Sequence, residues 1–141
     1  MDLIVYTDGG ARGNPGPAGI GVVFTDGQGN PLANFKSYIG SATNNVAEYR
    51  ALLLALDEAK KIGADRLTIN MDSELIVRQM QGQYKIKEPT LKILAGEVFK
   101  IINNFKLVEF RHIPREQNKI ADSLVNQAID EELSRKPAAF I

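Results

Sequence analysis

The chain has 141 residues, with 17 basic side chains balanced by 17 acidic ones, and no cysteine. This length suits one domain, and the lack of cysteine excludes disulfides, zinc ribbons, iron–sulfur clusters and thiol nucleophiles. Because the charges balance, phosphate binding must come from local clusters rather than from an overall field. No apolar stretch reaches the roughly 18 residues that span a bilayer, and the first residues lack a signal-peptide pattern. We therefore expect a cytoplasmic protein with no membrane partner.

The first 40 residues predict three strands. A β-branched and aromatic stretch at 3–7 runs into Asp8-Gly9-Gly10, which is typical of a buried strand that leaves the sheet at a turn. Two more strands, at 20–25 and 32–39, flank a turn at 26–30 that is rich in glycine and polar residues. This part of the chain therefore predicts an antiparallel meander.

The rest of the chain predicts helices that alternate with strands. Good helix formers from 44 to 62, with Gly63 at the C-cap position, predict a helix that is apolar nearly all round and therefore central. The later elements are a strand at 66–71, helices at 73–80 and 88–103, a strand at 106–113 and a helix at 117–133. This order predicts an α/β fold: a mixed five-stranded sheet, three strands antiparallel and then two parallel, flanked by helices.

Four carboxylates lie at positions that such a sheet can bring together. Asp8 and Asp72 end two predicted strands, whereas Glu48 and Asp122 lie near the starts of the central and last helices. Clustered carboxylates repel and raise one another's pKa, so a cation is needed to make the cluster tolerable. Four such oxygen ligands suit hard cations, and two divalent ions about 4 Å apart suit phosphoryl transfer.

Each carboxylate also has a purely structural explanation when it is taken alone. Asp8 suits a turn before two glycines, and Asp72 suits the cap of the helix that follows it. Glu48 is favourable near a helix N-terminus, and Asp122 suits a solvated helix surface. Only the joint placement of the four residues favours a catalytic metal site over these structural explanations.

Four short motifs resemble, in order, those of type 1 ribonuclease H: Tyr6-Thr7-Asp8-Gly9-Gly10, Thr43-Asn44-Asn45-Val46-Ala47-Glu48, Met71-Asp72-Ser73 and Ile120-Ala121-Asp122-Ser123. The resemblance covers nearly the whole chain and implies a ribonuclease H-like fold, in a domain at 1–135 followed by a short C-terminal tail at 136–141. It implies a monomeric endonuclease that hydrolyses the RNA strand of RNA–DNA hybrids with two Mg²⁺ ions, or Mn²⁺ in their place. The products would carry 5′-phosphate and 3′-hydroxyl ends.

The resemblance also implies residue roles. Asp8 would bridge both ions, Asp122 would bind the ion that activates water, and Glu48 with Asp72 would bind the ion at the leaving oxygen. Thr43 matches a hydroxyl that binds a DNA-strand phosphate, and Glu74 stands where many relatives carry glutamine. The family positions that read the ribose 2′-hydroxyl correspond to Asn14, Asn44, Asn45 and Glu48.

The chain departs from the family pattern in three places. Many relatives carry a histidine in the loop before the last aspartate, but the single histidine here, His112, falls in a predicted strand. Arg115 occupies the short loop instead, so we expect Arg115 rather than His112 to assist catalysis, through a phosphate contact. The basic protrusion of many relatives is reduced to 81–87, which indicates a compact branch with weaker substrate binding. Glu88 replaces an amide that often binds phosphate.

Three other functions stay open on the sequence. A related nuclease of the integrase or Holliday-junction kind would share fold and metals, although Thr43-Asn44-Asn45 argues against it because such enzymes need no reader of the 2′-hydroxyl. A hybrid-binding module without catalysis is expected to have lost at least one of the four carboxylates, and all four are present. An unrelated α/β protein would bind neither metal nor hybrid.

Overall fold

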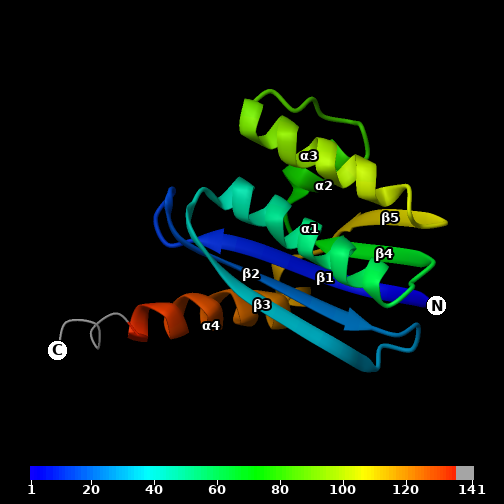
Figure 1. Cartoon of the computed structure of the whole chain (residues 1–141), viewed down its shortest axis with the longest axis horizontal. Coiled ribbons are helices and arrows are strands. Elements are labelled where there is room, and N and C mark those ends of the chain that lie inside the picture. The colour runs from blue at the N-terminus through cyan, green and yellow to red at the C-terminus, as the bar shows by residue number, and fades with distance from the viewer. Residues whose placement is uncertain (136–141) are drawn as a thin grey trace.

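The computed structural model describes residues 1–135, which form one five-stranded sheet with helices on both of its faces (Figure 1). The predicted tail at 136–141 lies outside the described residues. No helix within 1–135 is long and apolar enough to cross a membrane. The strands are β1 (Asp2–Ala11), β2 (Gly16–Thr25), β3 (Pro31–Ala42), β4 (Arg66–Met71) and β5 (Leu107–His112). The helices are α1 (Asn44–Lys61), α2 (Glu74–Met80), α3 (Pro89–Ile102) and α4 (Lys119–Arg135), with a short 3-10 helix, η1 (Arg115–Gln117).

The sheet order is β3-β2-β1-β4-β5. β2 pairs antiparallel with both β1 and β3, whereas β4 pairs parallel with both β1 and β5. The predicted mixed sheet is therefore confirmed. The parallel register between β1 and β4 ends at Tyr6 and Asn70, so Asp8 and Asp72 follow at the same edge of the sheet.

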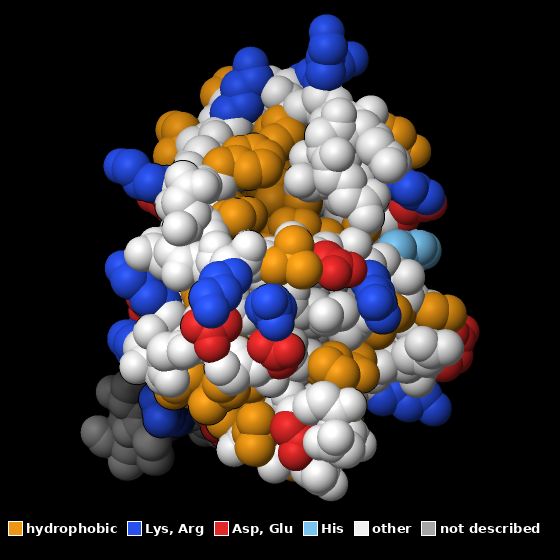
Figure 2. Space-filling view, turned by 90° about the vertical axis from the view of Figure 1, so that its right-hand side faces the viewer, with side chains coloured by type: hydrophobic (Ala, Val, Ile, Leu, Met, Phe, Trp, Pro, Cys, Tyr) orange, Lys and Arg blue, Asp and Glu red, His pale blue; other side chains and the backbone are white. Residues whose placement is uncertain are grey.

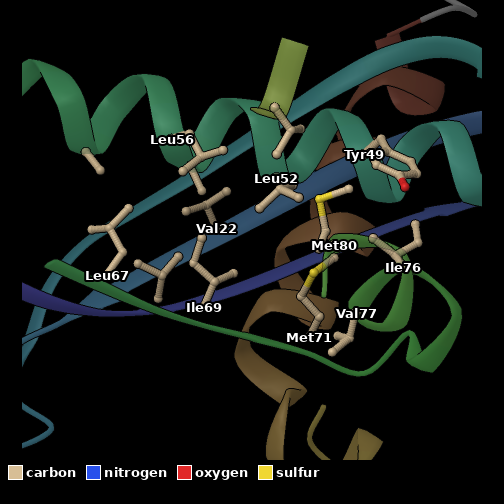
Figure 3. Packing of buried hydrophobic residues seen from close by; sticks show 14 of the residues in the cluster. Val22, Tyr49, Leu52, Leu56, Leu67, Ile69, Met71, Ile76, Val77 and Met80 are labelled. Carbon is tan, nitrogen blue, oxygen red and sulfur yellow. The ribbon is translucent and has the colours of Figure 1, made fainter. Parts of the chain in front are cut away.

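The main core lies between the sheet and α1, which is itself covered by α3 (Figure 1). Leu52 and Leu56 of α1 face Val22 of β2 and Ile69 of β4, and all four side chains are fully buried (Figure 3). α4 packs on the opposite face, against β1, β2 and β3. Because α1 is buried on two sides, as its apolar sequence predicts, its position relative to β1 is fixed.

Local capping explains where the helices of this core begin and end. Thr43 is the N-cap of α1, and its Oγ1 accepts a hydrogen bond from the Val46 N–H at 3.2 Å. Gly63 follows α1 with φ of 74° and donates to the Lys60 carbonyl, a Schellman ending that favours glycine. Pro89 is the first residue of α3.

Three predicted boundaries near the carboxylates are wrong. β1 does not turn at Asp8 but continues to Ala11, with Asp8 paired to Gly21 of β2. β2 correspondingly begins at Gly16, earlier than predicted. The last helix begins at Lys119, because residues 115–117 form η1 instead of its first turn. Gly9, one of the two glycines that suggested a turn, is instead required by close packing against α1.

The surface seen in Figure 2 has basic and acidic side chains lying beside one another, with apolar side chains lining a hollow in the upper part of the view. This mixture agrees with the zero formal net charge of the chain. On this face no single sign of charge gathers into a patch that would attract a polyanion.

Candidate active site

The structure brings the four predicted carboxylates together in one cleft of about 460 Å³. Asp8 lies on β1, Glu48 on α1, Asp72 directly after β4, and Asp122 in the first turn of α4. Carboxylate oxygens of the first three lie within 4.8 Å of one another, and the Asp122 carboxyl adjoins that of Asp8. Four residues from distant parts of the chain therefore present oxygen atoms to one small volume.

Gly9 sets the distance between β1 and α1. A Cβ atom at this position would lie 2.3 Å from the backbone carbon and oxygen of Ala47, so no larger residue allows this approach. The close contact lets the Gly9 N–H donate to Oε1 of Glu48 at 3.0 Å. Gly9 therefore places the Glu48 carboxylate beside Asp8, the residue that precedes Gly9 in the sequence.

Glycines of β2 allow an equally close approach on the other face of the sheet. A Cβ atom at Gly21 would lie 2.4 Å from the Ala121 carbonyl oxygen, and one at Gly19 would lie 2.7 Å from that of Val125. α4 consequently packs directly on β2, which brings Asp122 to Asp8 across the strand pair.

Two of the four carboxylates are poorly solvated, since Asp8 is 8% exposed and Glu48 7% exposed. Burial, the charge of Asp72 and the adjoining Asp122 carboxyl raise the pKa of Asp8 to about 8. Burial, together with the charges of Asp8 and Asp72, raises the pKa of Glu48 well above its ordinary value. In this environment the ionised forms of both residues are disfavoured without a cation.

Within residues 1–135, no lysine or arginine forms an ion pair with any of these carboxylates. Arg115, from η1, lines the cleft but makes no such pair. A set of oxygen donors whose charge is uncompensated by the protein is what a hard divalent cation requires. The residues present therefore fit a divalent metal site.

Two amides join the cleft to the turn between β1 and β2. Oδ1 of Asn44 accepts from the Ala11 N–H at 2.8 Å, and Oδ1 of Asn14 accepts from the Asn44 N–H at 3.0 Å. Because both carbonyl oxygens are occupied, each amide is left with its Nδ2 hydrogens to donate to another group. Asn44 also lines the carboxylate cleft.

A second hollow, of about 390 Å³, lies at the N-terminus of α1 and is lined by Asn14, Thr43, Asn45 and Glu88, among others. Oγ1 of Thr43 is already an acceptor as the α1 N-cap, so its hydroxyl hydrogen is what it has left to donate. Glu88 accepts from the Leu91 N–H at 2.9 Å as the N-cap of α3.

The other predicted residues lie in different surroundings. Glu74 is exposed in the first turn of α2, 3.4 Å from Arg78 in an ion pair, and is not among the residues lining either hollow. His112 is the last residue of β5 and is exposed, and it does not line the carboxylate cleft. Arg115 is therefore the one of the two that the structure places beside the carboxylates.

Sequence reasoning missed three polar residues near the carboxylates. Arg12 and Asn126 line the cleft, and Arg12 pairs with Asp130 at 2.7 Å. Asn118 donates from Nδ2 to Asp72 Oδ2 at 3.2 Å. Spacing could have identified two of them, because Asn118 and Asn126 lie four residues before and after Asp122, which is one helical turn in each direction.

Known proteins match most of the chain in sequence. A family model described as "Reverse transcriptase-like" matches residues 6–128. "Bifunctional protein Rv2228c" of Mycobacterium tuberculosis is 46% identical over 131 residues, which are 92% of this chain and 36% of that protein. "Ribonuclease HI" of Halobacterium salinarum is 39% identical over 126 residues, covering 89% of this chain and 63% of that protein. The chain thus spans between about a third and two thirds of the length of these curated relatives.

Solved structures agree in fold over almost their whole length. LC11-RNase H1, solved in complex with an RNA/DNA hybrid, is 55% identical with a TM-score of 0.90, covering 93% of this chain and 99% of that one. RNase H1 from Halobacterium salinarum is 37% identical with a TM-score of 0.91, again covering 93% and 99%. With the fold, the ordered motifs and the carboxylate cleft in agreement, the chain belongs to the type 1 ribonuclease H family.

Proposed function

We propose that this protein is an endoribonuclease that hydrolyses the RNA strand of RNA–DNA hybrids and leaves 5′-phosphate and 3′-hydroxyl ends. The principal support is the convergence of four carboxylates from β1, α1, the end of β4 and α4 in one cleft. The hybrid bound to LC11-RNase H1 supports this substrate. We further propose that residues 1–135 are the catalytic domain, that it acts as a monomer, and that its location is cytoplasmic.

The metals proposed are two Mg²⁺ ions, with Mn²⁺ as a substitute. Asp8 would contact both, Glu48 and Asp72 would complete one site, and Asp122 would complete the other. When bound, such ions supply positive charge at the attacking and departing oxygens of the phosphate. The protein contributes fixed ligands: the Gly9 N–H orients Glu48, and the Asn118 amide orients Asp72.

Arg115, from η1, lines the same cleft as the four carboxylates. A guanidinium stays protonated at neutral pH and therefore cannot act as a base. We propose that Arg115 instead donates to a non-bridging oxygen of the scissile phosphate, where it stabilises the charge that develops during the reaction.

Discrimination between RNA and DNA is proposed to depend on amides at and near the N-terminus of α1. The Nδ2 groups of Asn14 and Asn44, which donate no hydrogen bond among residues 1–135, suit the oxygen of a ribose 2′-hydroxyl, and Asn45 follows Asn44 in sequence. Thr43, in the second hollow, suits a DNA-strand phosphate. Glu74, two residues after Asp72 and exposed, is proposed to contact substrate outside the cleft.

The decisive experiment compares four labelled substrates: an RNA–DNA hybrid, an RNA duplex, a DNA duplex and a DNA duplex with one ribonucleotide. Each is incubated with Mg²⁺ or with EDTA. We expect Mg²⁺-dependent cutting confined to the RNA of the hybrid. Binding without cutting would instead indicate a hybrid-binding module, and cutting of DNA would indicate another nuclease of the superfamily.

A further inference from the structure

Asn118 connects the elements that carry three of the four carboxylates. Its Nδ2 donates to the carbonyl oxygen of Thr7 at 2.9 Å and to Asp72 Oδ2 at 3.2 Å. Its backbone carbonyl oxygen accepts from the Asp122 N–H at 3.1 Å. One residue thus contacts the peptide group just before Asp8, the Asp72 carboxylate, and the backbone of Asp122.

These contacts use all the donor capacity of the side chain. An amide nitrogen carries two hydrogens, and here each of them has an acceptor. Asn118 is 1% exposed, and its Oδ1 has no hydrogen-bond partner among the described residues. A buried carbonyl oxygen without a partner is unfavourable. The two hydrogen bonds donated by Nδ2 offset that cost, which explains why an amide side chain occupies this position.

We propose that Asn118 is a positioning residue of the metal centre, which orients the Asp72 carboxylate and ties its position to those of Asp8 and Asp122. Asn118 is not itself one of the proposed ligands. Its contact with Asp72 is a hydrogen bond to a ligand oxygen, and the loss of such outer contacts typically weakens metal binding about 10- to 100-fold. The inference rests on the proposed metal site.

The chain offers a matched control in Asn70. Its side chain is also buried, 6% exposed, and its Nδ2 donates to another β1 carbonyl, that of Val5, at 3.2 Å. No hydrogen bond joins this amide to a carboxylate among the described residues. Asn70→Ala therefore removes a side-chain amide that hydrogen-bonds to β1, while the hydrogen bond from Asn118 to Asp72 stays intact.

The test measures Mn²⁺ binding calorimetrically in the absence of substrate, for the full chain and for Asn118→Ala, Asn118→Ser and Asn70→Ala. We expect both Asn118 variants to bind Mn²⁺ at least about 10-fold more weakly than the unaltered chain, because neither side chain reaches both acceptors. Asn70→Ala should keep its Mn²⁺ affinity within about 2-fold, although its unfolding temperature falls. In hybrid cleavage, Asn118→Ala should need about 10-fold more Mg²⁺ for half-maximal rate, with kcat approaching that of the unaltered chain at saturating Mg²⁺.

Unchanged Mn²⁺ affinity in both Asn118 variants would overturn the proposal. An equal loss of affinity in Asn70→Ala would also overturn it, since anchoring of β1 rather than contact with Asp72 would then be the cause. If Asn118→Ala does not fold, Asn118→Ser decides the matter through the same titration. Failure of the unaltered chain to bind Mn²⁺ would instead reject the metal site itself, which is a distinct result.

Discussion

Asp8 and Gly21 are direct partners across β1 and β2, and at Gly21 α4 approaches so closely that a Cβ atom would lie 2.4 Å from the Ala121 carbonyl oxygen. The residue opposite the central carboxylate therefore admits the helix that carries Asp122. On the other face, Gly9 admits α1 and so brings Glu48 to the same place. The cleft depends on glycines as much as on acids, which can be tested.

Replacement of Gly9 by alanine should destabilise the protein by about 3 kcal/mol and abolish hybrid cleavage. The added Cβ would collide with the Ala47 backbone and force α1 away from β1, which separates Glu48 from Asp8. Urea denaturation and a cleavage assay measure the two effects. Gly27→Ala is the control, because nothing lies within 4 Å of a Cβ atom there, and it should change stability by less than about 0.5 kcal/mol. Full activity in Gly9→Ala would contradict this account of the cleft.

Asp8→Asn should reduce kcat by about 1,000-fold while the protein becomes more stable in EDTA at pH 8. The amide keeps the shape of the side chain but removes the charge that Asp72 and burial oppose. Single-turnover cleavage and thermal unfolding give the two measurements. Turnover like that of the unaltered chain would reject Asp8 as the central ligand.

Without divalent metal, the free energy of unfolding should fall as the pH rises from about 4 to about 8. The pKa of Asp8 is raised from 3.8 to about 8 in the folded chain. Between these values the folded state keeps a proton that the unfolded state has released, so raising the pH favours unfolding. Glu48, whose pKa is also raised, acts in the same direction.

This pH dependence is checked by chemical denaturation in EDTA over that range, and again with saturating Mg²⁺. Bound cations favour the ionised carboxylates, so the decline should become much smaller when metal is present. A stability that rises with pH in EDTA would show that the carboxylates are not destabilised by burial and mutual repulsion.

Arg115→Ala should lower kcat by about 100-fold, with a smaller effect from Arg115→Lys, which keeps the charge. His112→Ala should leave kcat nearly unchanged, because His112 is at the end of β5 and not among the residues lining the cleft. Steady-state kinetics on the hybrid distinguish the two residues. A large loss in His112→Ala alone would reverse the assignment.

The succession of strands and helices along the chain, and the mixed sheet, were predictable from the sequence because local signals marked most elements. Gly63 and Pro89 lie at helix ends where capping rules place them, and the apolar character of α1 matched its burial between the sheet and α3. The four carboxylates could be grouped in advance because Asp8 and Asp72 lie just beyond the parallel-paired stretches of β1 and β4, and Glu48 and Asp122 lie early in helices.

The errors arose where one residue type serves two physical purposes. Gly9 suggested a turn. In the structure it lies within β1, where the missing side chain lets α1 pack closely against the strand. The contact between Asn118 and Thr7 was missed because the two residues lie 111 positions apart, and no local pattern records a contact over that separation. Such contacts become visible only when the elements are placed in space.

The close approach at Gly9 and Gly21 gives a criterion for judging related sequences. A chain that retains four acidic residues in these motifs but carries a side chain at either glycine cannot bring α1 or α4 to the strands as this one does. Such a relative would keep the four acidic residues in its sequence but would lack the close helix packing that brings their carboxylates together. The two glycines are thus as informative about retained nuclease activity as the carboxylates themselves.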